Sequence, residues 1–184
     1  PNQLAVMVSE EHSLPFVTLK LIMDAGSWRD PPERGGLANL AAESMLLGTK
    51  ERPATEINET LDYLGTAVDA TCGWDYSQLS MKSLKKSLDR SFALFVEIIA
   101  GPQFPETEVQ REKRRILGLI ESEKEDPSAL AQKRFRESLF VKSPYGHPVE
   151  GTEETVPGLT NQMVIDFYRR YYQPKGAILA VVGD

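Results

Sequence analysis

The sequence predicts an α+β domain, and the order of its apolar patterns carries that prediction. Its expected strands come in adjacent groups, near the start and around Cys72-Gly73, while its expected helices follow one another from residue 84 to residue 172. A chain that forms a parallel α/β sheet would alternate strand and helix along its length. This order of elements therefore excludes an alternating parallel sheet.

The first half of the chain contains four expected strands and two expected helices. In chain order these are strands at 4–8 and 16–23, helices at 37–47 and 53–64, and strands at 66–71 and 74–82. The polar stretch 9–13 predicts that the first two strands pair across a turn. The helix at 37–47 is rich in Ala and Leu and has no Gly, Pro or β-branched residue, so we expect it to be largely buried. Gly48 and Gly65 mark the ends of the two helices, and Pro53 opens the second.

The second half is expected to be mostly helical. Its elements are helices at 84–100, 106–125, 127–140 and 161–172, and a final strand at 177–182. Apolar residues recur at helical spacing in these segments, Pro102 and Pro105 separate the first two helices, and Thr160 is the expected N-cap of the last. The apolar run of the final strand predicts that this strand is buried.

Composition narrows the classes of function. The chain has 184 residues, a formal net charge of −6 and 41% hydrophobic residues. This length and apolar content allow a core of ordinary size and exclude a disordered chain. The negative charge argues against a nucleic-acid binder, and no apolar run reaches the length of a membrane span. One cysteine excludes an intramolecular disulfide, and two histidines cannot supply a three-histidine zinc site.

Both ends of the sequence lie close to expected strands. Pro1 precedes the first strand directly, and Gly183-Asp184 follow the last. We therefore expect residues 1–184 to be a single domain of a longer protein whose natural N-terminus is missing.

The helix at 37–47 carries a polar pair on an otherwise apolar face. Asn39, Ala42 and Glu43 share one side of this helix because they stand at positions i, i+3 and i+4. From these residues alone we favour a buried hydrogen bond with a neighbouring helix over a metal or catalytic site.

Residues 36–49 resemble the metal-site helix of the pitrilysin, insulin-degrading enzyme and mitochondrial processing peptidase family. That helix reads Gly-x-Ala-His-x-x-Glu-His and contains the inverted zinc signature H-x-x-E-H, in which two His bind zinc and the Glu is the general base. In a gapless alignment the first His falls on Asn39, the Glu on Ala42 and the second His on Glu43. The family's third ligand, a Glu, falls on Leu119, and a supporting acidic residue falls on Glu112. We expect Leu119 to continue the apolar stripe of Ile116 and Ile120, and Glu112 to meet Asn39 or Glu43.

The resemblance covers nearly the whole chain and sets the functional expectation. Further matching segments are Ala25–Trp28, Gly101–Phe104, Tyr145–Thr152, Phe167–Pro174 and Val181–Asp184. It implies a mostly antiparallel sheet with helices against one face, and a second, similar domain beyond this chain. Because the ligand and base identities are absent, it implies an inactive member with no catalytic residues, no bound zinc and no other cofactor, which works with a zinc-bearing homologous subunit and supports the binding of extended peptide.

Two alternatives stay open. One is an active zinc peptidase with displaced ligands, such as Glu43, Glu112 and His147, and the other is a scaffold subunit without a peptide role. We interpret His147 as structural, Cys72 as a small buried thiol, and Lys113-Arg114-Arg115 as a solvated helix face with intrahelical ion pairs. The resemblance to exported bacterial relatives implies a periplasmic location, with the cytoplasm as the alternative.

Overall fold

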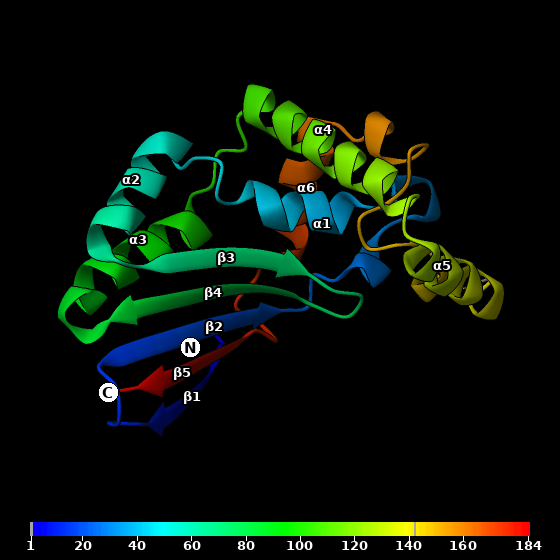
Figure 1. The fold of residues 1–184 in the computed structure, drawn as a ribbon. Helices are drawn as coiled ribbons and strands as arrows, with labels where there is room; N and C mark the ends of the chain where they lie inside the picture. Colours follow the sequence, from blue (N-terminus) through cyan, green and yellow to red (C-terminus); the bar gives the residue numbers. More distant parts are fainter. Residues whose placement is uncertain (1, 142) are drawn as a thin grey trace.

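A five-stranded sheet forms the centre of the computed structural model, which describes residues 2–141 and 143–184. Its order is β1–β5–β2–β4–β3, where β1 is Ala5–Glu10, β2 Phe16–Met23, β3 Ala67–Cys72, β4 Ser77–Leu84 and β5 Ile178–Gly183. Only β1 and β5 run parallel to each other, and the other pairs are antiparallel (Figure 1). The mostly antiparallel sheet is therefore confirmed.

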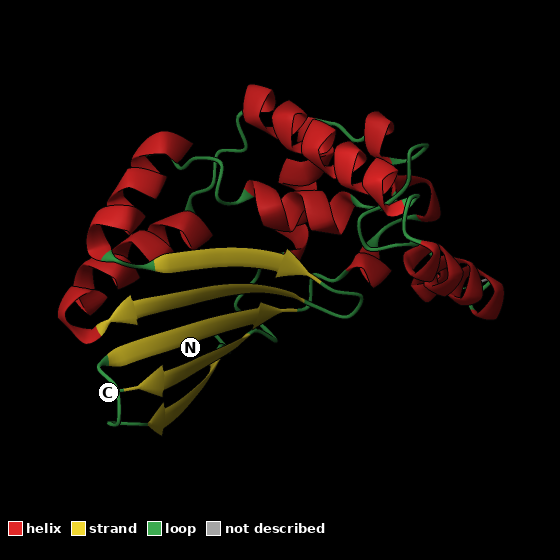
Figure 2. Cartoon of the chain, viewed as in Figure 1, coloured by secondary structure: helices red, strands yellow, loops and turns green. Residues whose placement is uncertain are grey.

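The helices gather on one side of this sheet (Figure 2). They are α1 (Leu37–Ser44), α2 (Ala54–Leu64), α3 (Leu88–Ala100), α4 (Glu106–Glu123), α5 (Pro127–Leu139) and α6 (Asn161–Tyr171). The side chain of Thr160 accepts a hydrogen bond from the Met163 N–H and caps α6, as the sequence predicts. Within residues 2–141 and 143–184, the helices all lack the combination of length and apolarity that a membrane span requires. The predicted α+β class is confirmed.

The hydrophobic core lies between the sheet and α1. Alternate residues of β2 and β4 point toward the helices and are buried, among them Leu19, Leu21, Leu79 and Met81. Helix α1 contacts β3 on one side and α4 and α6 on the others. Nearly every residue of α1 is buried, which explains why its apolar residues are spread around the helix rather than confined to one stripe.

The start of α1 is fixed by a glycine and a buried aspartate. Gly36 has φ of 94°, and a Cβ at this position would lie 2.6 Å from the carbonyl oxygen of Glu150. The Asp30 carboxylate accepts hydrogen bonds from the backbone N–H groups of Gly36, at 3.0 Å, and Ala38, at 2.9 Å. Asp30 therefore satisfies amide donors at the N-terminus of α1, although it precedes the helix by several residues.

Two expectations about the strands are wrong. The first two strands do not pair with each other, because β5 lies between β1 and β2 and bonds to both. The short polar stretch between β1 and β2 favours a hairpin of these two strands. Instead, the apolar strand β5 pairs with the edge of β2 that β1 would occupy in such a hairpin. The final strand is also only partly buried, with Ile178 and Val182 exposed, because it lies close to the edge of the sheet.

Further differences concern where elements begin. Strand β4 begins at Ser77 rather than residue 74, because a turn brings the Gly73 N–H to the carbonyl oxygen of Tyr76. Helix α3 begins at Leu88 rather than residue 84, since Leu84 still pairs with Phe16 in the sheet. These shifts leave the order of elements unchanged.

Two glycine substitutions test this packing in opposite directions. We expect Gly36→Ala to lower the free energy of unfolding by about 1–3 kcal/mol, because it forces an L-residue into left-handed backbone. Gly118 lies inside α4 with no atom within 4 Å of an added Cβ. Gly118→Ala should therefore raise the free energy of unfolding by about 0.5–1 kcal/mol. Urea denaturation measures both, and a neutral Gly36→Ala would contradict the close approach to residue 150.

Candidate functional site

The candidate site lies where α1 meets α4. Asn39 and Ala42 of α1 are buried, and the Glu43 side chain is three-quarters buried. Glu43 of α1 and Glu112 of α4 lie side by side, because one guanidinium nitrogen of Arg115, Nη2, contacts a carboxylate oxygen of each. Of the two partners expected for Glu112, Asn39 or Glu43, the structure places Glu43 beside it through this shared contact.

Arg115 joins these two acidic side chains. Its guanidinium donates to Glu43 across the helix interface and contacts Glu112 on its own helix, with Nε 2.7 Å and Nη2 2.6 Å from the nearest carboxylate oxygen. Arg115 therefore allows α1 and α4 to pack together at a position where each helix carries an acidic side chain. Sequence reasoning assigned Arg115 to an intrahelical pair and missed the contact with Glu43, which no local pattern reveals.

The two carboxyl groups have pKa values shifted in opposite directions. Burial, and then the hydrogen bond with Glu112, raise the pKa of Glu43 to about 7. Burial acts in the same direction on Glu112, but hydrogen bonds with Glu43 and Arg115 outweigh it and lower the pKa of Glu112. At neutral pH the site therefore holds one ionised carboxylate, one titrating carboxyl group and one permanent cation.

These residues do not fit a catalytic zinc ion. A catalytic site needs three protein ligands, an open position for water and a base. The Arg115 guanidinium contacts both the Glu43 and the Glu112 carboxylates, and its positive charge opposes a divalent cation there. Ala42 is fully buried and carries no proton-transferring group. No hydrolytic step can be derived from this arrangement.

Two expectations about α4 are wrong. Leu119 is 46% exposed, so it does not continue the buried apolar stripe of Ile116 and Ile120. Ile116 and Ile120 face the core, whereas Leu119 follows the exposed edge of α4 that carries Arg115. Lys113 is not solvated either, because its Nζ donates to the carbonyl oxygens of Pro157 and Leu159 at 3.0 and 2.6 Å.

The other candidate residues lie apart from this interface. Nδ1 of His147 lies 3.0 Å from the carbonyl oxygen of Pro148, and its neighbour Trp74 donates to the His147 carbonyl at 3.3 Å. Burial raises the pKa of the Cys72 thiol to about 12, which makes the thiol a poor nucleophile. In the described parts of the chain, His, Cys, Asp and Glu form no group of three that could hold a metal ion. The structure thus does not bring Glu43, Glu112 and His147 together as displaced ligands.

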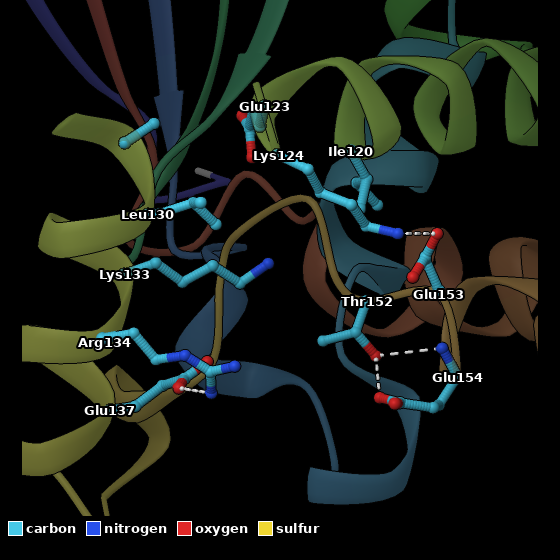
Figure 3. A pocket seen from close by; sticks show the side chains of 11 residues that line it. Ile120, Glu123, Lys124, Leu130, Lys133, Arg134, Glu137, Thr152, Glu153 and Glu154 are labelled. Carbon is cyan, nitrogen blue, oxygen red and sulfur yellow. Dashed lines mark hydrogen bonds and ion pairs between the residues drawn. The ribbon is translucent and has the colours of Figure 1, made fainter. Parts of the chain in front are cut away.

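A cleft of about 450 Å³ opens near the C-terminal end of α4, between α4, α5 and residues 152–154 (Figure 3). Its lining includes the apolar side chains of Ile120 and Leu130 together with charged side chains of both signs. Lys124 bonds to Glu153 across the cleft at 2.8 Å. Because most of these charges are paired, the cleft lacks the excess of positive charge that phosphate groups require. Three separate segments form its walls, so sequence patterns did not predict it.

Comparison with known proteins settles the family. The family model described as "Insulinase (Peptidase family M16)" matches residues 5–153. The chain belongs to the M16 peptidase family. This confirms the resemblance read from residues 36–49 and the expectation of a zinc-protease relative.

Relatives of this M16 chain are longer than the chain itself. It is 25% identical over 183 residues to an "Uncharacterized zinc protease" of Rickettsia bellii, and the match covers all of this chain and 44% of the relative. It is 22% identical over 177 residues to mitochondrial cytochrome b-c1 complex subunit 1 of Bos taurus, covering 96% of this chain and 37% of that protein. The chain thus spans less than half the length of these relatives.

A solved structure shares this fold. The crystal structure of a peptidase M16 inactive domain from Pseudomonas fluorescens matches with a TM-score of 0.94 and 26% identity, over all of this chain and 45% of that chain. The fold of this M16 chain is therefore that of a domain described as inactive.

The raised pKa of Glu43 predicts a change in pH dependence. Because the folded-state pKa is about 7 and the ordinary value is 4.5, the folded chain binds more protons than the unfolded chain between these values. As the pH rises through this range, the free energy of unfolding of the wild type should therefore fall relative to that of the Glu43→Gln variant. Denaturant unfolding at several pH values measures the difference, with Glu125→Gln as an exposed control. A flat or rising difference would show that Glu43 is not buried as described.

A graft tests whether the M16 backbone geometry survives. In an Arg115→Gln background, which removes the cation from the interface, we expect the four changes Asn39→His, Ala42→Glu, Glu43→His and Leu119→Glu to create a zinc site, because zinc stabilises a folded state that presents its ligands. Zinc should raise the melting temperature of this variant by about 5 °C or more. The control carries Leu119→Gln in place of Leu119→Glu. A folded quadruple variant that zinc does not stabilise would place residue 119 away from α1.

Proposed function

We propose that this chain is a non-catalytic part of a two-part M16 peptidase, which assembles with a zinc-bearing homologue and helps to hold extended peptide. The observation that carries the proposal is the Arg115 ion-pair bridge between Glu43 and Glu112 at the α1–α4 interface. A fold that is preserved around a site closed by a fixed cation favours a role in binding or assembly over hydrolysis.

The edge strand β3 is the proposed peptide surface. It lies at the end of the sheet and contacts α1, so a strand added to its free edge would run beside the candidate site. Backbone N–H and C=O groups at a sheet edge can bind an extended peptide by strand addition. Exposed Asp69 and Thr71 leave this edge polar, which disfavours permanent pairing with another sheet.

Assembly with a second subunit has separate support. The bovine relative is by name a subunit of the cytochrome b-c1 complex. A zinc-bearing partner would supply the ligands, the base and the bound water that this chain cannot supply. Under this proposal, Asn39, Ala42 and Glu43 therefore take no part in catalysis.

Reconstitution tests the assembly. The full-length protein should co-purify with a zinc-bearing M16 homologue encoded in the same genome, and the pair should cleave unstructured peptides that this protein alone leaves intact. The proposal fails if the isolated full-length protein cleaves such peptides and a chelator stops the cleavage. Assembly without any peptide binding by this subunit would instead support a scaffold role.

Backbone methylation tests the peptide surface. A fluorescent extended peptide should lose about tenfold or more in affinity when alternate backbone amides are N-methylated, because methylation removes donors needed for strand addition. The unmethylated peptide of the same sequence is the control. Equal affinities would exclude strand addition at β3 and leave only side-chain recognition.

A further inference from the structure

A small cavity of about 140 Å³ opens beside the start of α1. Three helices border it: α6, which packs beside α1 (Figure 1), and the short 3-10 helices η1 (Ser27–Arg29) and η2 (Pro32–Arg34). Each of these helices contributes one arginine to the lining, and the three are Arg29, Arg34 and Arg170. The cavity therefore gathers guanidinium groups from segments that lie far apart in the sequence.

The charges in this lining do not cancel. Among the described residues that border the cavity, Asp166 is the single acid against three arginines. The Asp166 carboxylate accepts a hydrogen bond from the Gln162 side-chain amide of its own helix at 2.9 Å. Three arginines and one aspartate give the lining a formal charge of +2, in a chain whose net charge is −6. Such a local excess of positive charge attracts anions.

Two of the three arginines lack an ion-pair partner. In the described part of the chain, the ion pairs of 4.0 Å or less include Arg29, which binds Asp24, but neither Arg34 nor Arg170. The pair with Asp24 uses Nε of Arg29, at 3.3 Å, and Nη2, so the Nη1 donors stay outside it. Arg34 and Arg170 are exposed, and an anion can reach them from solvent. All three guanidinium groups therefore keep donors that a ligand can use.

An aromatic ring holds two of these guanidinium groups near each other. The Cζ atoms of Arg29 and Arg170 each lie 5.3 Å from the centroid of the Tyr171 ring, and Arg29 also stacks on Trp28 at 3.7 Å. Cation–π attraction explains how each guanidinium is positioned, but it does not remove the repulsion between like charges at one cavity. A bound anion would offset that repulsion.

We propose that this arginine cavity, lined by Arg29, Arg34 and Arg170, binds a phosphate group. Guanidinium groups form paired hydrogen bonds with phosphate oxygens. Arginines from three separate helices suit the tetrahedral oxygens of a phosphate better than a planar carboxylate, which one arginine can satisfy. The formal charge of +2 also matches a phosphate dianion.

The size of the cavity limits the ligand. Its volume of about 140 Å³ is below the roughly 300 Å³ at which sites for drug-sized molecules begin, so it admits the phosphate group rather than the whole of a large ligand. The source is therefore free phosphate or a phosphate monoester. This inference is independent of the proposed peptidase role and of the peptide surface on β3.

Inorganic phosphate is the first probe. Equilibrium dialysis of radiolabelled phosphate against the full-length protein, at neutral pH and constant ionic strength, measures its affinity. The variant Arg34→Gln/Arg170→Gln should weaken binding about tenfold or more, because it removes two charged donors. Arg90→Gln is the matched control, since Arg90 is also exposed and lies 5.8 Å from a tyrosine ring, that of Tyr63, but does not line the cavity. Melting curves establish that both variants remain folded.

Competition experiments identify the ligand. Acetate should displace phosphate at least about tenfold less well than unlabelled phosphate does. Vesicles of phosphatidic acid and phosphatidylcholine that displace phosphate, where phosphatidylcholine alone does not, would support the cavity and assign a lipid headgroup as its source. Vesicles without effect would support it with a soluble phosphate as the source, provided that phosphate itself binds.

Three results would overturn the proposal. The first is the absence of saturable phosphate binding below about 10 mM. The second is equal weakening by Arg34→Gln/Arg170→Gln and Arg90→Gln, which would mean that phosphate responds only to the total charge of the protein. The third is equal displacement by acetate, which would mean that the cavity binds anions without selecting phosphate.

Discussion

The burial of α1 is the constraint on which the rest of the structure depends. This helix lies between the sheet, α4 and α6, so each of its faces must meet another element. The backbone at the start of α1 is held in place, because Gly36 approaches the Glu150 backbone and Asp30 accepts amide hydrogen bonds from Gly36 and Ala38. Residues on α1 therefore keep a fixed orientation toward α4, whichever chemistry they carry.

This fixed geometry explains why the fold does not require zinc ligands at positions 39 and 43. In the active relatives implied by the family motif, a metal ion would supply positive charge between α1 and a later helix. Here the Arg115 guanidinium contacts acidic side chains from both helices, Glu43 and Glu112. A partly buried pair of carboxyl groups without a cation would be costly, so Arg115 stabilises the interface as it closes the site.

Much of the fold follows from local patterns, but the pairing of distant elements does not. Helical spacing and cap residues such as Thr160 predicted the helices well, and the α1 motif identified the family. The insertion of β5 between β1 and β2, and the contact from Arg115 to Glu43, join residues far apart in the sequence. Leu119 was misassigned because an apolar residue near a buried stripe need not share its helix phase. The compartment stays a prediction.

Zinc titration of the wild-type chain tests the central claim most directly. If Arg115 holds Glu43 and Glu112 as the structure describes, calorimetry at neutral pH should give only the heat of dilution. Saturable one-to-one zinc binding that Glu43→Gln abolishes would contradict the account. It would mean that zinc displaces the guanidinium and that the α1–α4 interface retains a metal site.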